Sequence, residues 1–356
     1  MTSMTSDRTV RHERSEFIRR MPKAELHVHL EGSIRAPTLL ELAARRNVEL
    51  PARDVAGIER WLTFRDFDHF LEIYLTISRC LRNPEDFQLA TAAFLEERAR
   101  ENILYTEAHL TISTHVANGA NGDEIAEALA ETVAAGEKDL GVRLRWIADI
   151  VRNVDFGRAD QTLEWALDHL DKYVVGLGLS GKESHPAQPF REHFAVAETE
   201  GLHRTVHAGE QSGAAAIWDA LEHCGAERIG HGIRSVEDPR LLDVLRERKI
   251  PLEVCPTSNL RLGLVPSLEE HPVLGIHDAG IPWTLNSDDP ALFHSSLTQE
   301  FEAVGDLMSL DLRELAELSM AALEHAFLED SERASLQRVF RTWFTDQGVD
   351  RLPEDR

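Results

Sequence analysis

The chain repeats one pattern eight times: a short apolar run, followed by a longer stretch with helical spacing. The long stretches carry apolar residues three and four positions apart, as in residues 89–95. The short runs predict strands at residues 24–30, 103–110, 142–150, 173–180, 203–208, 228–231, 250–255 and 282–286. Strands that alternate with helices form parallel units, and eight units favour a closed (β/α)8 TIM barrel over an open sheet.

The remaining segments predict helices around and beyond this barrel. Helices between the strands are expected at residues 85–100, 123–140, 187–200, 214–223, 239–249 and 267–279. Residues 37–81 are too long for one connection and predict a helical insertion after the first strand, and residues 311–344 predict two or three closing helices. Residues 1–12, rich in Ser, Thr and Arg, predict a disordered tail. Residues 13–356 are therefore expected to form a single domain.

Composition excludes several classes of partner. The apolar content of 42% and charged content of 28% are those of a globular protein. A net charge of −24 argues against binding nucleic acid or an anionic membrane surface, both of which need clustered Lys and Arg. The N-terminus has no apolar signal segment, and no run approaches the roughly eighteen apolar residues of a membrane span. The chain has three cysteines, which are widely spaced, so the sequence does not predict a set of disulfides. A reducing, cytoplasmic setting is therefore expected.

Two histidines mark the end of the first predicted strand. His27 and His29 are two residues apart, so their imidazoles lie on one face of the strand. Other predicted strands end in polar residues of the same chemical kind, namely His207, Glu210, His231, Asp288 and Asp289. Because all strand ends of a barrel surround one mouth, where barrel active sites gather, the sequence predicts one site rather than scattered structural histidines.

The residue types at this mouth suit a hydrolytic metal site. Three imidazoles and one carboxylate fit zinc better than iron or manganese, with an open position for water. A bound divalent metal lowers the pKa of water to about 7. A further histidine and a glutamate can then serve as proton acceptor and proton donor.

Four segments resemble the adenosine deaminase family of the amidohydrolase superfamily. They are His27-Val28-His29-Leu30-Glu31-Gly32, His207-Ala208-Gly209-Glu210, Gly230-His231-Gly232 and Ser287-Asp288-Asp289-Pro290. The resemblance runs in order over residues 17–344. It implies a C–N hydrolase that acts on a small 6-aminopurine and releases ammonia from C6.

The resemblance also implies a role for each matching residue. One zinc ion per chain would be bound by His27, His29, His207 and Asp288. His231 would orient and deprotonate the attacking water, and Glu210 would protonate purine N1. The substrate would be bordered by His29, with Asp289 at N7, the Gly181 backbone N–H at N3 and Glu31 at a ribose hydroxyl.

Two segments leave the group on purine N9 open. Residues 178–183 read Gly-Leu-Ser-Gly-Lys-Glu where many adenosine deaminases read Asp-Leu-Ala-Gly-Asp-Glu, and residues 108–111 replace an Arg-Tyr-Ser-Pro-like stretch. Adenosine is the first choice of substrate. The alternative is 6-amino-6-deoxyfutalosine, a menaquinone precursor whose benzoate could meet a cation such as Lys182 or Arg35. Free adenine ranks lower because the Asp-Ser-Ser-Glu run of adenine deaminases is absent, and N6-methyl-AMP is a further substrate of the family.

Two other classes compete with this hypothesis. A two-metal amidohydrolase would place a carboxylated lysine at the end of the fourth strand, and Lys182 lies two residues past Ser180. A non-catalytic metal-binding barrel would lack a catalytic residue, but the expected set is complete. A cytidine-type zinc deaminase is excluded because the chain has no Pro-Cys-x-x-Cys element.

Overall fold

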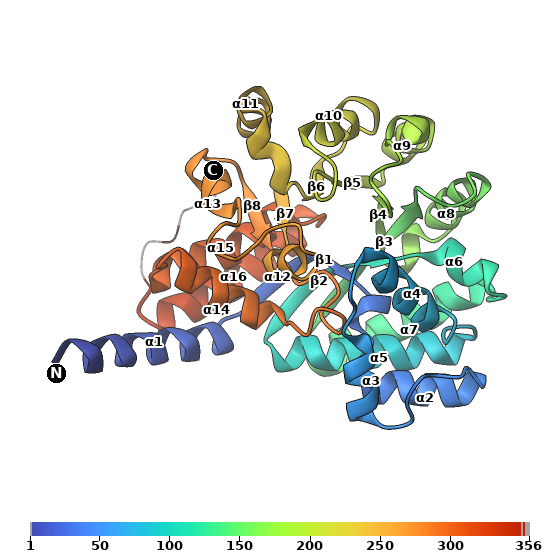
Figure 1. The fold of residues 1–356 in the computed structure, drawn as a ribbon, viewed down its shortest axis with the longest axis horizontal. Coiled ribbons are helices and arrows are strands. Elements are labelled where there is room, and N and C mark those ends of the chain that lie inside the picture. Colours follow the sequence, from blue (N-terminus) through green and yellow to red (C-terminus); the bar gives the residue numbers. More distant parts are fainter. Residues whose placement is uncertain (1, 350–351, 353–356) are drawn as a thin grey trace.

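A computed structural model describes residues 2–349 and residue 352, with side chains from residue 11 onward. Eight parallel strands form one sheet in the order of the sequence. Helices surround this sheet (Figure 1). The strands are β1 (Lys23–His29), β2 (Ile103–Leu110), β3 (Arg143–Val151), β4 (Val174–Ser180), β5 (His203–Ala208), β6 (Arg228–His231), β7 (Leu252–Val254) and β8 (Trp283–Leu285).

Hydrogen bonds between the first strand and the segment after the last one close the sheet. The Asp288 N–H donates to the His27 carbonyl at 3.1 Å, and the His29 N–H donates to the Asp288 carbonyl at 2.9 Å. The Asn286 Oδ1 atom accepts from the N–H groups of Leu26 and His27. The predicted (β/α)8 barrel is therefore confirmed.

The strands match their predicted positions closely, but β7 and β8 are shorter than residues 250–255 and 282–286. Pro251 and Pro282 stand directly before these two strands. Because proline has no N–H to donate, the hydrogen-bonded part of each strand begins at the residue after the proline. In β1, Leu26 and Val28 are fully buried on the face opposite to the two histidines, as the alternation predicts.

Helices cover the outside of the barrel and the connections between strands. They are α5 (Pro84–Arg100), α6 (Ile112–Ala117), α7 (Gly122–Leu140), α8 (Gly157–Asp168), α9 (Arg191–Thr199), α10 (Ala214–His223), α11 (Pro239–Arg248), α12 (Pro256–Arg261) and α13 (Val273–Asp278). The helix expected at residues 187–200 is divided into a 3-10 turn, η3 (Gln188–Phe190), and α9. The closing helices are α14 (Leu297–Leu307), α15 (Leu312–His325) and α16 (Asp330–Asp346).

The predicted insertion after β1 is present as three helices, α2 (Ala36–Arg46), α3 (Val55–Leu62) and α4 (Phe67–Ser78). Asp54 and Asp66 cap the N-termini of α3 and α4 by accepting backbone N–H groups. The ring of Phe70 stacks on Phe293, with centroids 5.6 Å apart, so α4 is fixed to the segment that follows β8. This places α4 over the C-terminal ends of the strands.

Helix α1 (Thr2–Arg20) precedes β1, and the assignment of residues 1–12 to a disordered tail stays a prediction. No Gly or Pro interrupts residues 2–20, so a helix can continue through them. Phe17 and Ile18 are buried, and the Phe17 ring lies 5.3 Å from that of Trp343. Residue 1 lies outside the described residues, and the single-domain assignment stays a prediction. Among the described helices, none has the length and apolar character needed to cross a bilayer.

Candidate metal centre and active site

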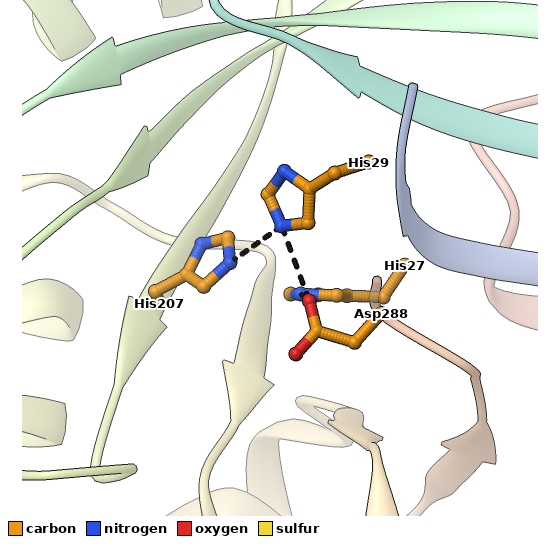
Figure 2. A group of neighbouring side chains, drawn as sticks. All are labelled: His27, His29, His207 and Asp288. Carbon is orange, nitrogen blue, oxygen red and sulfur yellow. Dashed lines mark hydrogen bonds and ion pairs between the residues drawn. The ribbon is translucent and has the colours of Figure 1, made fainter. Parts of the chain in front are cut away.

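Four buried side chains converge where β1, β5 and β8 end (Figure 2). They are His27, His29, His207 and Asp288, and their ligand atoms all lie within 4.8 Å of one another. The Nε2 atoms of His29 and His207 are 3.2 Å apart. The Asp288 Oδ1 atom lies 3.3 Å from His29 Nε2 and 3.6 Å from His27 Nε2.

The geometry of this cluster fits a divalent metal. Ligand atoms about 2.0–2.2 Å from a tetrahedral zinc ion lie about 3.3–3.6 Å apart, which is close to the distances above. The His27 Nε2 atom is buried and has no hydrogen-bond partner in the described part of the chain. A buried polar atom without a partner is costly unless a ligand satisfies it. The predicted ligand set is thus brought together by the fold.

Backbone conformation helps to aim these residues. Asp288 and His231 have φ angles of 62° and 60°, in the left-handed region that non-glycine residues rarely adopt. At Gly230, a Cβ atom would lie 2.9 Å from the His27 ring and 3.1 Å from the His207 backbone. The glycine next to His231 therefore leaves room for two of the ligands.

Glu253, in the middle of β7, holds the ring of His27. Its Oε2 atom lies 2.7 Å from His27 Nδ1, and its Oε1 atom accepts from Arg228 at 2.6 Å. Burial alone would raise the pKa of Glu253, but Arg228 and His27 lower it to about 2. The charged carboxylate keeps the ring proton on Nδ1 and leaves Nε2 free for a metal. The sequence analysis missed Glu253, although it is a lone acidic residue in an apolar run.

A second carboxylate, Asp149 in β3, lies behind His29. Its Oδ2 atom is 3.8 Å from His29 Nδ1, and its Oδ1 atom is 3.0 Å from His109 Nδ1. The His109 ring lies 4.8 Å from the rings of both His27 and His29. His109 therefore lies beside the metal ligands inside the barrel, rather than on the substrate side as its segment was expected to be. Asp149 was also missed, although it too is the one acidic residue of an apolar strand.

A cavity opens from the metal cluster towards the barrel mouth. At its metal end it is lined by His29, His207, Glu210, His231, Asp288 and Asp289. Gly181 and Ser180 line it at the end of β4. The remainder is formed by α4 and by the segments after β2 and β3. Four of the predicted site residues beyond the metal ligands, namely Gly181, Glu210, His231 and Asp289, thus share one cavity.

Glu210 and Asp289 are carboxyl groups held in this cavity with little access to water. Burial, together with the carboxylates of Asp288 and Glu183, raises the pKa of Glu210 well above its ordinary range. Burial and Asp288 likewise raise the pKa of Asp289. At Gly32, a Cβ atom would lie only 1.6 Å from Asp289 Oδ1, so this position must remain glycine for Asp289 to stay in place. Both acids are suited to donate a proton or hydrogen bond at neutral pH.

His231 faces both carboxyl groups from the end of β6. Its Nε2 atom lies 3.9 Å from Glu210 Oε1 and 3.9 Å from Asp288 Oδ2. Its Nδ1 atom lies 3.2 Å from the Asn259 amide nitrogen, and the Asn259 Oδ1 atom lies 3.1 Å from His271 Nε2. This chain of contacts fixes the direction of the ring, so that Nε2 faces the cavity.

A family model described as adenosine deaminase matches residues 22–343 of the chain. The chain belongs to the adenosine deaminase family. It is 38% identical to an aminodeoxyfutalosine deaminase of Streptomyces coelicolor over 330 residues, 92% of this chain and 85% of the relative. It is 37% identical to an adenine deaminase of the same organism over 313 residues, 88% of this chain and 92% of the relative. The chain is accordingly a hydrolase of C–N bonds.

A solved structure gives the same result for the fold. The adenine deaminase of Arthrobacter aurescens superposes with a TM-score of 0.86 at 31% sequence identity. The match covers 91% of this chain and 99% of the other. The adenosine deaminase family thus accounts for the whole barrel, including the inserted and closing helices.

Glu31, to which the family resemblance gave a ribose hydroxyl as partner, is bound to residues behind the cavity wall, and its contact with substrate stays a prediction. Its Oε1 atom accepts from the Thr111 N–H at 3.1 Å, the Thr111 hydroxyl at 2.6 Å and His115 Nε2 at 2.8 Å. Burial alone would raise the pKa of Glu31, but hydrogen bonds from His115 and Thr111 lower it to about 2. Glu31 is fully buried and does not line the cavity, whereas Thr111 does. In this arrangement Glu31 supports the cavity wall.

Neither of the two cations expected to meet an anionic substrate group lines the cavity. The Lys182 ammonium group pairs with Asp68 at 2.7 Å and is exposed. Arg35 bonds Glu97 and two backbone carbonyls. Lys182 is paired with Asp68 and is not among the described residues that line the cavity, so it is not placed to bridge two metals at this site. Instead, Arg158 in the first turn of α8 lines the cavity.

Proposed function

We propose that the chain hydrolyses the C6 amino group of a 6-aminopurine and releases ammonia, with aminodeoxyfutalosine as its substrate. The observation that carries this proposal is the convergence of three histidines and Asp288 beside Glu210, His231 and Asp289 in one cavity. Family membership and the similarity to aminodeoxyfutalosine deaminases support it. Adenosine, the first choice from the sequence, receives less support than this alternative.

Zinc is the metal proposed for the cluster. His27, His29, His207 and Asp288 would hold one ion, and Glu253 and Asp149 would keep two of the imidazoles in position. When bound, zinc would act as a Lewis acid and lower the pKa of the water that it binds to about 7. The donor set of imidazole nitrogen and carboxylate oxygen is the one that this metal prefers.

The protein's own residues supply the proton chemistry. Glu210 keeps its proton because burial and neighbouring carboxylates raise its pKa, so it can give that proton to purine N1. Ring protonation makes C6 more electrophilic. Asp289, also kept neutral by burial and by Asp288, can donate a hydrogen bond to N7, which is an acceptor. We assign to His231 Nε2 the orientation of the attacking water, and to the Gly181 N–H a hydrogen bond to N3.

The residues that line the cavity favour a substrate larger than free adenine. Besides the polar residues at the metal end and Gly181, the lining includes apolar side chains of α4 and of the segment around the end of β3. Free adenine ends at N9 and would leave this region without a ligand, whereas aminodeoxyfutalosine carries ribose and an aromatic ring there. Adenine remains the second candidate because a relative named adenine deaminase is nearly as similar.

The test compares three substrates with the zinc-reconstituted protein. We expect kcat/KM for aminodeoxyfutalosine to exceed that for adenosine and adenine at least about 10-fold, measured by the change in ultraviolet absorbance on deamination. Glu210→Gln should lower turnover at least about 100-fold, the usual size of a general-acid contribution, while one zinc per chain is retained. Glu222→Gln, at an exposed position on α10, is the matched control and should change neither quantity.

Two results would contradict the proposal. Near-normal deamination by the Glu210→Gln variant would remove Glu210 from the reaction. Two metals per chain by mass spectrometry of the metal content, together with no deamination of any 6-aminopurine, would favour the two-metal class instead.

A further inference from the structure

We propose that Arg158 binds a carboxylate at the end of the substrate remote from C6, so that the substrate class is a 6-aminopurine nucleoside carrying an aromatic acid. This inference rests on the proposed function, since it concerns the same cavity. It names the residue that distinguishes a charged substrate from adenosine and adenine.

The position of Arg158 sets it apart from the reacting end. Arg158 is the second residue of α8, which follows β3, and it lines the cavity together with Asn153 and Val154. The reactive carboxyl groups, Glu210, Asp288 and Asp289, follow β5 and β8. In the barrel, β4 separates β3 from β5, and β1 and β2 separate β3 from β8, so Arg158 and these carboxyl groups lie on different parts of the rim. A ligand that reaches both must span the part of the rim between them.

The positive charge of Arg158 has no carboxylate partner among the described residues. It is the one Arg or Lys among the described residues that line this cavity, and its side chain is half-buried. No ion pair or hydrogen bond joins its guanidinium to any residue in the described part of the chain. The carboxyl groups that line the cavity, Glu210, Asp288 and Asp289, all lie at the metal end. A partly buried guanidinium that lacks an anion is a binding site for one.

Nearby cations contrast with Arg158 because each has its own partners. Arg152 donates to the backbone carbonyls of Ser180, Leu179 and His185. Lys182 is paired with Asp68. These cations stabilise the loops after β3 and β4, whereas the guanidinium of Arg158 is left for a ligand.

The lining between the two ends fits an aromatic spacer. The α4 side of the cavity presents Phe67, Phe70, Leu71 and Leu75, and the β3 side presents Val151 and Val154. These side chains offer apolar contact and no charge. A flat ring can lie between them, and the planar guanidinium fork can bind a carboxylate on that ring through two parallel hydrogen bonds. An unsubstituted ribose offers neither the ring nor the anion, and a phosphate ester offers the anion without the ring.

The experiment is a binding cycle with two ligands and two proteins. The ligands are aminodeoxyfutalosine and its neutral primary amide, which differ in charge and little in size. The proteins are zinc-loaded Glu210→Gln, in which turnover should be at least about 100-fold slower, and the same protein with Arg158→Gln added. Calorimetry gives the Kd of each ligand for each protein. The factor by which Arg158→Gln weakens the carboxylate ligand, divided by the factor for the amide ligand, isolates the contact between Arg158 and the carboxylate.

We expect Arg158→Gln to weaken the carboxylate ligand about 10- to 100-fold and the amide less than about 3-fold, as for a charge-assisted hydrogen bond. Lys182→Gln is the matched control, since it removes an exposed cation from the same mouth, and should change neither Kd. Equal losses for both ligands, no loss for either, or no binding of either ligand would overturn the inference.

Turnover by the wild-type protein separates this inference from the proposed function. Deamination of adenosine, which has no carboxylate, tests the chemistry at C6 without Arg158. If adenosine is deaminated and the cycle shows no selective loss, the inference about Arg158 fails alone. If no 6-aminopurine is deaminated but the selective loss is seen, the proposed function fails and the carboxylate site stands.

Discussion

Glu210 and Asp289 show how single residues acquire their chemistry from their surroundings. Ordinary carboxyl groups are ionised at pH 7 and cannot donate a proton. Here burial, with Asp288 close to both, keeps the neutral form. The negative charge of Asp288 therefore serves two purposes, since it offers an oxygen to a cation and holds protons on its neighbours.

A pH dependence follows from the raised pKa of Glu210. The active form is the protonated acid, so activity is present below the pKa of Glu210 in the enzyme and is lost as pH rises through it. We predict that kcat/KM declines on the alkaline side with an apparent pKa well above the ordinary value of about 4.3. The measurement is a profile of kcat/KM from pH 5 to pH 10 for the zinc-loaded protein.

Asp289→Asn is the control for this assignment, because an amide can donate to N7 and does not titrate. The alkaline decline should persist in that variant. A decline that disappears with Asp289→Asn belongs to Asp289 instead, and a rate that only rises with pH contradicts the acid role of Glu210.

Helix α4 forms one wall of the cavity at the barrel mouth. Phe67, Phe70, Leu71, Tyr74 and Leu75 lie three to four residues apart and line one side of the cavity. The ion pair between Asp68 and Lys182 joins α4 to the loop after β4, but an exposed pair contributes at most about 1 kcal/mol. Apolar contacts, such as that between Phe70 and Phe293, are therefore what holds α4 in place.

Tyr74 gives a prediction for this helix. Tyr74 lines the cavity, and its buried hydroxyl lies near the Glu31 carboxylate but makes no hydrogen bond of ordinary geometry with the described residues. We predict that Tyr74→Phe raises KM about 2- to 10-fold, as for loss of one neutral hydrogen bond to substrate, without lowering the melting temperature. Steady-state kinetics and thermal unfolding measure the two quantities.

Tyr105→Phe is the matched control, because the Tyr105 hydroxyl donates to Glu107 at 2.7 Å inside the barrel. This variant should lower the melting temperature and leave KM unchanged. An unchanged KM in Tyr74→Phe, or a loss of stability there, would show that the hydroxyl serves the fold rather than the substrate.

At the scale of the whole molecule, the barrel was predictable because its signals are local. Each strand is buried on both faces and reads as an apolar run, and barrel topology brings the ends of β1, β5, β6 and β8 to one mouth whatever the loops do. The residues of the candidate site could therefore be predicted to share one mouth, whereas the choice of metal ligands among them came from the family resemblance.

Other residues depend on contacts that no local pattern records. Glu31 directly follows the ligand strand, yet the turn η1 (Glu31–Ser33) directs it to Thr111 and His115 instead of the cavity. Arg158 lies in a connecting segment, and its place in the cavity depends on the path of residues 152–156. In helix α1, the burial of Phe17 and Ile18 against the barrel likewise depends on distant residues such as Trp343.

The closure of the barrel gives the last prediction, centred on Asn286. Strand β8 ends at Leu285, and the Asn286 Oδ1 atom then accepts the N–H groups of Leu26 at 2.9 Å and His27 at 3.1 Å. Asn286→Ala would leave two buried N–H groups without acceptors, so we expect a loss of about 2–5 kcal/mol in the free energy of unfolding. Denaturant titration measures this loss.

The same closure carries two of the proposed metal ligands, His27 on one side and Asp288 on the other, joined by the hydrogen bond between their backbones. Loosening it should therefore weaken zinc binding at least about 10-fold, measured by competition with a chelator. Asn121→Ala is the control: it removes the cap of α7, remote from the cluster, and should cost about 1 kcal/mol with zinc affinity unchanged. If Asn286→Ala unfolds more easily but binds zinc as tightly as the wild type, then closure and metal site are independent, and the ligands are held by their own strands alone.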